Sequence, residues 1–442
     1  NYQNVLSGIN SSELTTISGS IYGFNYLLSN TNSTLGTWDL TLSTLSGMFG
    51  SINNASIAAF INATPLSGSI AGLYNTGTIG YLSNSSTITG SVDGINNVGT
   101  IGVNANTGIR NTGSISSIKN TGTIAGNQGV VNQGNLNALN NNGLITASYG
   151  SAVINSGSIG RLANNGTLNG RFAGLTNQSS GSITAIVNSR SGSIVATSGG
   201  LSNYGSIGTL NNLGMIGLGG AGFAGVNNNA TIASIDNGGI IQSWQNGIVN
   251  NTSGTIQDLT NRSSGSLLGA KGLSNSGLVQ ALNNIGTIDG RNTGLYNTNG
   301  TISSLTNSGT ITGASAGINN TIGGVIGGAA VATAINNTGS ISSLTNSGSI
   351  TATAHDILNS GVINQIDNLQ GKNGSVVSAL TYSGNLASNY NIIIKSLTQY
   401  GELAASSVTG TMAFGFADNS ALIAGNYQNV LSGINSSELT TI

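Results

Sequence analysis

One sequence motif returns along most of the chain and limits the folds that the chain can adopt. From about Ser67 to Val377 the pattern is Gly-[Ser/Thr]-Ile-x-x-Leu-x-Asn-x-Gly-[Ser/Thr]-Ile, and residues 113–124, 300–311 and 339–350 are clear copies. The key aliphatic residues alternate between a step of nine residues and a step of 11 to 16. One short and one long step make about 22 residues, the size of one coil in a stacked repeat protein. The motif therefore predicts a solenoid.

The residue types within the motif favour β-strands. Aliphatic side chains at fixed positions can stack inward, coil upon coil, and the Thr and Ser beside them suit the outer face of short strands. We expect glycine to supply positive φ at the corners and asparagine to tolerate the left-handed region in turns. The predicted fold class is thus all-β, a β-solenoid (β-helix) of stacked coils of about 22 residues, with roughly 14 coils between Ser67 and Val377.

Asparagine stands at matching places in successive copies of the motif. If these residues align from coil to coil, their side-chain amides form a hydrogen-bonded ladder, as stacked asparagines do in cross-β assemblies. The alternative is a simple turn preference of asparagine, with no ladder. The residues predicted to serve as structural ladder or turn positions are Asn111, Asn120, Asn155, Asn164, Asn307 and Asn346.

Composition excludes several classes of function. Only 5% of the 442 residues are charged, and the net charge of −1 gives no electrostatic basis for binding nucleic acid or an anionic membrane surface. No apolar run approaches the roughly 20 residues needed to span a bilayer. Cysteine is absent, which removes disulfides and thiolate metal sites. Aliphatic residues at regular intervals argue against the disorder that so little charge and so much glycine would otherwise indicate.

The two flanks of the repeat region differ from it. Residues 1–50 and 378–425 hold most of the Tyr and Phe outside the repeats and carry longer strand-like runs. We predict a β-rich capping or junction module whose first half is 378–425 and whose second half is 1–50, with solenoid repeats over 51–377. The capping module should continue the stack with larger, aromatic-containing strands.

The most specific feature is a duplication. Residues 426–442, NYQNVLSGINSSELTTI, are identical to residues 1–17. This identity predicts a 425-residue period in a giant tandem array, with 426–442 as the start of the next period. The alternative is that overlapping ends were included, which still requires a parent with two copies or a deliberate duplication. The residues predicted to form the inter-unit junction are Tyr2, Val5, Leu6, Trp38, Phe414, Phe416 and Tyr427.

Three stretches of the junction module resemble a known family. Residues 391–406, 410–434 and 23–42 together are similar to the C-terminal part of autotransporter (type V secreted) passengers. In that family such a stretch follows Asn- and Gly-rich solenoid repeats and precedes an outer-membrane barrel. Here another set of repeats follows residues 38–42 in place of a barrel. The resemblance implies an extracellular or cell-surface location and Gram-negative-type secretion.

Many β-helices are polysaccharide lyases or hydrolases, and sugar chemistry needs paired carboxylates at close range. The densest charged group within the repeats is Asp258, Arg262, Lys271, Asp289 and Arg291, and the two aspartates are close enough in sequence to lie on neighbouring coils. This group carries the enzyme hypothesis, and a solvated pair of charges on a loop is the simpler interpretation.

No other constellation indicates catalysis. His355 is the one histidine, and no serine stands out as its nucleophile. One His and no Cys leave only isolated carboxylates for a metal ion. We therefore predict no catalytic residues, no cofactor and no metal.

Together these features predict a structural component of an extracellular bacterial filament or surface fibre, built by end-to-end stacking of tandem units. The predicted partner is the protein itself, as tandem or end-to-end copies. The alternative function is an adhesin that binds host or neighbouring-cell surfaces, with cell-surface or matrix glycans as partners. A polysaccharide-active enzyme is the third hypothesis.

Overall fold

The computed structural model describes residues 2–6, 18–21, 24–32, 37–44, 48–102, 105–218, 222–373 and 378–441. The chain divides into two compact units. The first contains Asn1–Ser148 and Gly157–Gly160, and the second contains Tyr149–Ser156 and Arg161–Ile442. The boundary between the units falls inside the predicted repeat region.

The fold is an all-β parallel β-solenoid, as predicted. Strands make up 62% of the chain, and successive coils are about 23 residues apart. The two units together contain about 17 turns. This number exceeds the roughly 14 coils expected between Ser67 and Val377, because parallel strands begin before that range and continue after it, from Phe49 to Thr441.

In each unit, every coil contributes strands to two parallel sheets, here called sheet 1 and sheet 2. In the first unit, sheet 1 contains β5 (Phe49–Asn53), β8 (Leu66–Gly68), β9 (Ala71–Asn75), β12 (Thr87–Gly90), β13 (Asp93–Asn97), β16 (Ser114–Asn120) and β19 (Asn135–Asn141). Sheet 2 contains β6 (Ser56–Ile57), β7 (Phe60–Asn62), β10 (Thr78–Ile79), β11 (Leu82–Asn84), β14 (Thr100–Ile101), β15 (Thr107–Asn111), β17 (Thr123–Ile124), β18 (Gln128–Asn132) and β20 (Leu144–Thr146).

The first unit also holds a separate antiparallel sheet with the strand order β1-β4-β3-β2. Its strands are β1 (Tyr2–Leu6), β2 (Ser18–Ile21), β3 (Phe24–Asn32) and β4 (Thr37–Thr44). Strand β1 is therefore an edge strand, and its only partner among the described residues is β4. In this pairing Tyr2 lies opposite Leu40, and Leu6 lies opposite Trp38.

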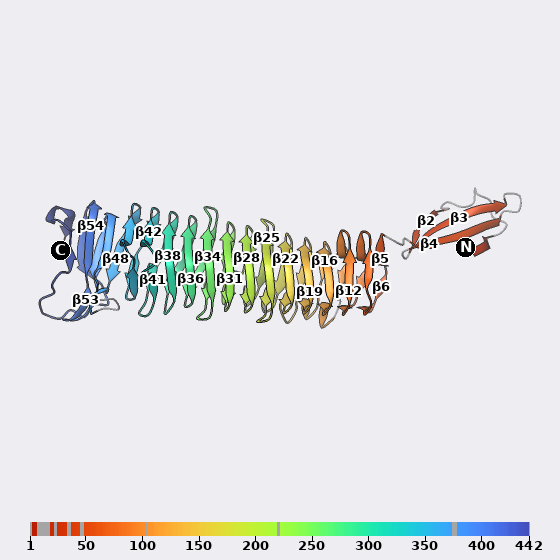
Figure 1. The fold of residues 1–442 in the computed structure, drawn as a ribbon, viewed down its shortest axis with the longest axis horizontal. Helices are drawn as coiled ribbons and strands as arrows, with labels where there is room; N and C mark the ends of the chain where they lie inside the picture. Colours follow the sequence, from red (N-terminus) through yellow and green to blue (C-terminus); the bar gives the residue numbers. More distant parts are fainter. Residues whose placement is uncertain are drawn as a thin grey trace. The chain divides into compact units, whose positions relative to one another are not determined.

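In the second unit, strands of successive coils lie side by side along the stack (Figure 1). Sheet 1 contains β25 (Ser182–Asn188), β28 (Ser206–Asn212), β31 (Thr231–Asn237), β34 (Thr255–Asn261), β36 (Leu278–Asn284), β38 (Thr301–Asn307), β41 (Val325–Gly327), β42 (Thr333–Asn337), β45 (Ser349–Thr351), β46 (His355–Asn359), β50 (Leu380–Asn385), β54 (Leu403–Thr409) and β56 (Leu431–Ser432). Strand β22 (Ser158–Asn164) also belongs to sheet 1, and the boundary between the two units falls within it.

Sheet 2 of the second unit contains β21 (Val153–Asn155), β23 (Thr167–Gly170), β24 (Leu175–Asn177), β26 (Ser193–Ala196), β27 (Gly199–Asn203), β29 (Met215–Ile216), β30 (Ala224–Asn228), β32 (Ile240–Gln242), β33 (Asn246–Asn250), β35 (Ser266–Asn275), β37 (Thr287–Asn297), β39 (Thr310–Gly313), β40 (Ala316–Asn320), β43 (Ser340–Ile341), β44 (Leu344–Asn346), β47 (Val362–Ile363), β48 (Gln365–Asn368), β51 (Asn389–Ile392), β55 (Met412–Phe416) and β57 (Leu439–Thr441). A small antiparallel sheet is formed by β49 (Gly371–Lys372), β53 (Gln399–Gly401) and β52 (Ile394–Ser396). The short helix η2 (Ser436–Glu438) is 3-10.

Strand β36 shows why the motif folds in this way. Val279, Leu282 and Asn284 are buried, whereas the residues between them point outward or lie partly exposed. The parallel register places Val279 between Ile256 and Ile302 of the neighbouring coils, so identical positions stack on one another. A short step of the motif runs along one such seven-residue strand and its turn. In most coils the long step runs through sheet 2 and its corner, whereas in residues 339–350 the short step does.

The expected positive φ is found at some glycines of the chain, but the glycines of the Asn-x-Gly turns have a different role. Among the described residues, positive φ occurs at Gly102, Gly217 and a few other glycines, but not at the glycines of the Asn-x-Gly turns. At Gly122, a turn glycine, an added Cβ would lie 2.0 Å from the carbonyl oxygen of Gly99 in the preceding coil. These positions require glycine because stacked turns bring two backbones together. The left-handed role expected for asparagine is also wrong, since no ladder asparagine has positive φ.

Candidate functional site

Asparagine side chains form two buried columns within each unit. In the first unit each Nδ2 donates to Oδ1 of the asparagine in the next coil at 2.7 to 2.9 Å. These columns are Asn53, Asn75, Asn97, Asn120 and Asn141 in sheet 1, and Asn62, Asn84, Asn111 and Asn132 in sheet 2. The ladder prediction is therefore confirmed, and turn preference alone does not account for these residues.

The second unit continues the same arrangement, with Nδ2–Oδ1 distances of 2.7 to 3.0 Å. Sheet 1 supplies Asn164, Asn188, Asn212, Asn237, Asn261, Asn284, Asn307, Asn337 and Asn359. Sheet 2 supplies Asn155, Asn177, Asn203, Asn228, Asn250, Asn275, Asn297, Asn320, Asn346 and Asn368. All six asparagines predicted from the sequence lie in these columns.

The columns have a direction. Each amide nitrogen donates toward the coil that follows in sequence, and each Oδ1 accepts from the coil before it. At Asn284, Nδ2 also donates to the carbonyl oxygens of Gly286 at 3.2 Å and Thr310 at 3.1 Å. A buried amide that is satisfied in this way stabilises both its own turn and the contact with the next coil.

Two buried tyrosines end the columns. Tyr382 lies opposite Ile357, in a core position that is otherwise aliphatic, and its hydroxyl accepts a hydrogen bond from Asn359 Nδ2 at 2.9 Å. The same hydroxyl donates to the carbonyl oxygen of Asn385. Tyr390 accepts from Asn368 Nδ2 at 3.2 Å in the same manner.

A hydroxyl can accept a hydrogen bond as well as donate one. Each tyrosine hydroxyl therefore accepts the hydrogen bond of the last asparagine in a column, in the place of a further asparagine. Burial raises the pKa of Tyr382 and Tyr390 well above the usual tyrosine range. Sequence reasoning missed this role. Its signal was a tyrosine at a position where the motif has an aliphatic residue.

A buried polar pair lies beside the end of the columns. The Gln370 side chain accepts from the backbone N–H of Ile350 and donates to its carbonyl oxygen, both at 2.8 Å. Asp356 is 4% exposed and accepts from the backbone N–H groups of Ala352 at 2.8 Å and Thr381 at 2.9 Å. Burial raises the pKa of the Asp356 carboxyl above its ordinary value.

The duplicated segment adds the last coil to the stack. Strand β56 pairs in parallel with β54, with Leu431 opposite Leu403, and β57 pairs in parallel with β55, with Leu439 opposite Met412. The backbone N–H of Leu403 also donates to the carbonyl oxygen of Val430 at 3.0 Å. Residues 426–441 thus extend both sheets by one coil.

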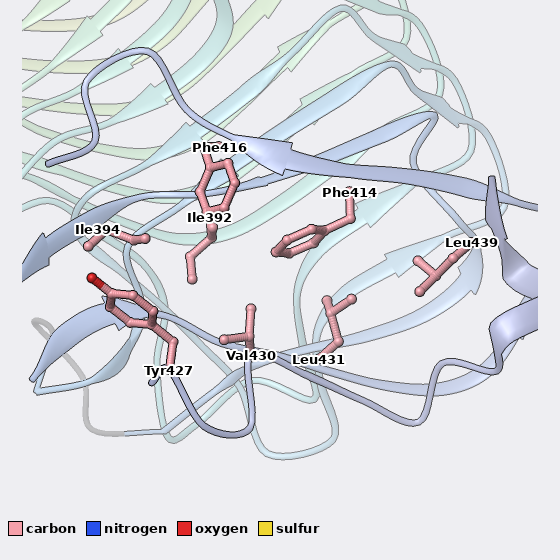
Figure 2. Close-up of a pocket in the computed structure, with 8 residues that line it drawn as sticks. All are labelled: Ile392, Ile394, Phe414, Phe416, Tyr427, Val430, Leu431 and Leu439. Atoms are coloured by element: carbon pink, nitrogen blue, oxygen red, sulfur yellow. The ribbon is translucent and has the colours of Figure 1, made fainter. Parts of the chain in front are cut away.

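An apolar cavity of about 320 Å³ lies beneath this last coil (Figure 2). Residues from the solenoid strands line one part of it, and residues from the duplicated segment line the rest. The lining residues are Ile392, Ile394, Phe414, Phe416, Tyr427, Val430, Leu431 and Leu439. The wall of the cavity is therefore almost entirely apolar.

Aromatic contacts hold the segment in place. The rings of Tyr400 and Tyr427 meet edge to face, with 5.1 Å between centroids. The Tyr400 hydroxyl donates to the carbonyl oxygen of Gln428 and accepts from its N–H, each at 3.1 Å. Such a pair combines apolar burial with a fixed register.

The predicted junction residues fall into two groups. Phe414, Phe416 and Tyr427 meet at the cavity in the second unit. In the first unit, Tyr2, Val5 and Leu6 belong to β1, which pairs with β4 around Trp38. The two groups belong to different units, and a junction between them stays a prediction.

The charged residues of the enzyme hypothesis contact different partners and do not all contact one another. Asp258 lies in sheet 1, on β34, and Asp289 lies on β37 of the next coil in sheet 2. Arg262 pairs with Asp236, and the Arg291 guanidinium lies 3.8 Å from the ring centroid of Trp244. The two aspartates are thus on neighbouring coils but in different sheets.

Exposed aromatic side chains gather at the corners of sheet 2. Tyr149, Phe172, Phe223 and Trp244 are 73%, 57%, 45% and 54% exposed. Backbone hydrogen bonds connect the stacked corners, as from Phe172 N–H to the carbonyl oxygen of Gly150 at 3.0 Å. Guanidinium groups lie over two of the rings, Arg291 on Trp244 and Arg171 on Tyr149.

Within the described ranges, no group of three or more His, Asp or Glu is placed to hold a metal ion. The part of the chain that the structure describes contains no helix with the length and apolar character needed to cross a membrane. Comparison of the chain with models of known protein families, with curated proteins and with solved structures gives no match.

Proposed function

We propose that this chain is a non-enzymatic structural component of an extracellular bacterial filament or surface fibre, built by end-to-end stacking of tandem β-solenoid units. The duplicated segment carries this proposal. Residues 426–442 repeat residues 1–17, and they continue both parallel sheets of the coil before them. A sequence that begins one period therefore also extends the solenoid of the period before it.

The ladders and the core suit a load-bearing role. The asparagine columns connect each coil to the next through buried amides, and aliphatic residues stack in register beside them. Each coil contacts only its neighbours, so the stack can lengthen without a larger core. The resemblance to autotransporter passengers supports an extracellular location.

Electron microscopy of the protein isolated from the cells that make it tests this proposal. About 17 turns at about 4.8 Å per turn make the solenoid part of one period about 80 Å long, which sets a lower limit for the axial repeat. Unbranched fibres with a repeat at or above that limit are expected. Isolated single chains at every concentration would contradict the proposal.

A second candidate function is adhesion through glycans, and the exposed aromatic corners favour it. Aromatic rings carry apolar faces that fit the C–H faces of sugars, and exposed aromatic residues on a stable stack mark interaction sites. The corner residues supply such rings in a chain with only 5% aromatic residues.

Binding to immobilised cell-surface polysaccharides, measured for the full chain, tests this second function. Trp244→Ser and Phe223→Ser should each weaken binding about tenfold or more. Ile322→Ser removes an apolar side chain that is 71% exposed and lies outside the corner row, so it serves as the control. Equal binding by all three variants and the wild type would refute the role of the corners.

A further inference from the structure

We infer that the duplicated sequence is an exchangeable coil, so that residues 1–17 of a second copy of this chain can occupy the end of the stack that residues 426–442 occupy in the structure. The inference rests on the proposed fibre function and names the segment and the surface that would join two separate chains. The partner is a second copy of this chain, and the site is the end formed by β54 and β55.

Sequence identity makes the two copies chemically equivalent. The four half-buried side chains that contact the cavity are Tyr427, Val430, Leu431 and Leu439. With an offset of 425 residues, their equivalents in the first copy are Tyr2, Val5, Leu6 and Leu14. Every contact made by the C-terminal copy is therefore available to the N-terminal copy of another chain.

The receiving surface needs a cover. Strands β54 and β55 pair with β50 and β51 on one side, and on the other side their described partners are only the short strands β56 and β57. Removal of the segment would leave unpaired backbone groups and an apolar surface around Ile392 and Phe414. An open sheet edge of this kind recruits an added strand.

The first copy is placed so that it can be released. Strand β1 is at the edge of its sheet and pairs only with β4 among the described residues, so its departure leaves β2, β3 and β4 paired. The five residues YQNVL form an antiparallel edge strand in one copy, whereas in the other copy only the last of them, Leu431, lies in a parallel strand. One sequence thus has two conformations within a single chain.

Covalent attachment decides which copy occupies the end. A tethered segment competes at a high effective concentration, of the order of millimolar for a short linker. In the wild-type chain residues 426–442 should therefore exclude free copies. Weakening this copy, while copy 1–17 is left intact, should open the end to a second chain.

The test uses the full 442-residue chain with Tyr427→Ser and Val430→Ser, called the opened variant. A fluorescent synthetic peptide, NYQNVLSGINSSELTTI, should bind the opened variant at least about 100-fold more tightly than it binds the wild type. The opened variant should also form concentration-dependent oligomers in sedimentation velocity, and excess peptide should dissolve them. Hydrogen-exchange protection of β25–β38 checks that the stack remains folded.

A matched variant separates the two copies. Adding Tyr2→Ser and Val5→Ser to the opened variant removes the same side chains from copy 1–17. This fourfold variant should still bind the wild-type peptide but should no longer self-associate. A folded opened variant that ignores the peptide, that binds a scrambled peptide equally well, or that oligomerises despite the fourfold change would overturn the inference.

The result is distinguishable from failure of the fibre proposal. Fibres with the expected repeat but no peptide binding would mean that periods join only through a continuous chain. Peptide exchange without fibres in the native material would support the inference and refute the proposed function.

Discussion

Replacing one ladder asparagine should destabilise the solenoid locally and strongly. Asn284 is completely buried, and its side chain makes four hydrogen bonds. Its neighbour Asn283 lies on the same strand but is half-buried and points away from the column. Asn284→Ala and Asn283→Ala are therefore a matched pair that differs mainly in the ladder.

The magnitude follows from those hydrogen bonds. The NH2 group shares its two hydrogens among three of these bonds, so the side chain makes about three full hydrogen bonds, which at a net value of about 1 kcal/mol each amount to about 3 kcal/mol. Asn261 Nδ2 keeps two carbonyl acceptors, at 3.2 and 3.0 Å, whereas Asn307 Oδ1 loses the donor that Asn284 provides. Asn283→Ala should change the free energy of unfolding by only about 0.5 kcal/mol.

Hydrogen exchange followed by mass spectrometry is the appropriate assay, because a repeat protein loses stability coil by coil and need not unfold in one step. Amides of β34, β36 and β38 should exchange about 100-fold faster in Asn284→Ala. Amides of the distant strand β25 should be unchanged. Equal exchange in the Asn284→Ala and Asn283→Ala variants would refute an energetic role for the ladder.

Three further substitutions test other features of the fold. Gly122→Ala should cost about 1–3 kcal/mol, because its Cβ would meet the carbonyl oxygen of Gly99; urea unfolding of the first unit measures the loss, and unchanged stability would contradict the close-approach argument. Tyr382→Phe should cost about 1 kcal/mol by removing one of the two acceptors of Asn359 Nδ2, with the carbonyl oxygen of Asn385 kept, and faster exchange in β46 should show this loss. Burial raises the pKa of Asp356, so its carboxyl holds more protons folded than unfolded above the ordinary value of 3.8; stability of β46 should be highest at low pH and fall as pH rises through the folded pKa. Asp356→Asn should flatten that dependence, and an equal slope in the variant would assign it to other groups.

The sequence predicted the coil and the ladder because both depend on contacts between equivalent positions. A motif of about 22 residues stacks on copies of itself, so the register of Val279 on Ile256 or of Asn284 on Asn261 follows from alignment of the repeats alone. The candidate site was predicted in part. Phe414, Phe416 and Tyr427 do meet, but the cavity also needs Ile392, which no repeat pattern singles out.

Features outside the repeat could not be predicted in the same way. The role of Gly122 depends on the distance between two stacked turns, which a single copy of the motif does not contain. The tyrosines that end the columns depend on their coil: Tyr382 must be in register with Ile357 for its hydroxyl to reach Asn359. A repeat pattern predicts contacts that recur from coil to coil, and at the end of a stack these contacts are no longer repeated.

The way in which the columns end bears on the proposed stacking of one copy on another. A column of amides is directional, so without the tyrosines the end would present donor groups of Asn359 and Asn368 that lack the Oδ1 acceptor found in every earlier coil. Tyr382 and Tyr390 accept from those donors before the last coils, and the cavity beneath the last coil is lined by apolar side chains. An apolar end depends on shape and on a short stretch of backbone pairing, which any copy of the duplicated sequence supplies. In the proposed fibre, termination of the ladders would therefore make the end of one period compatible with the start of any other.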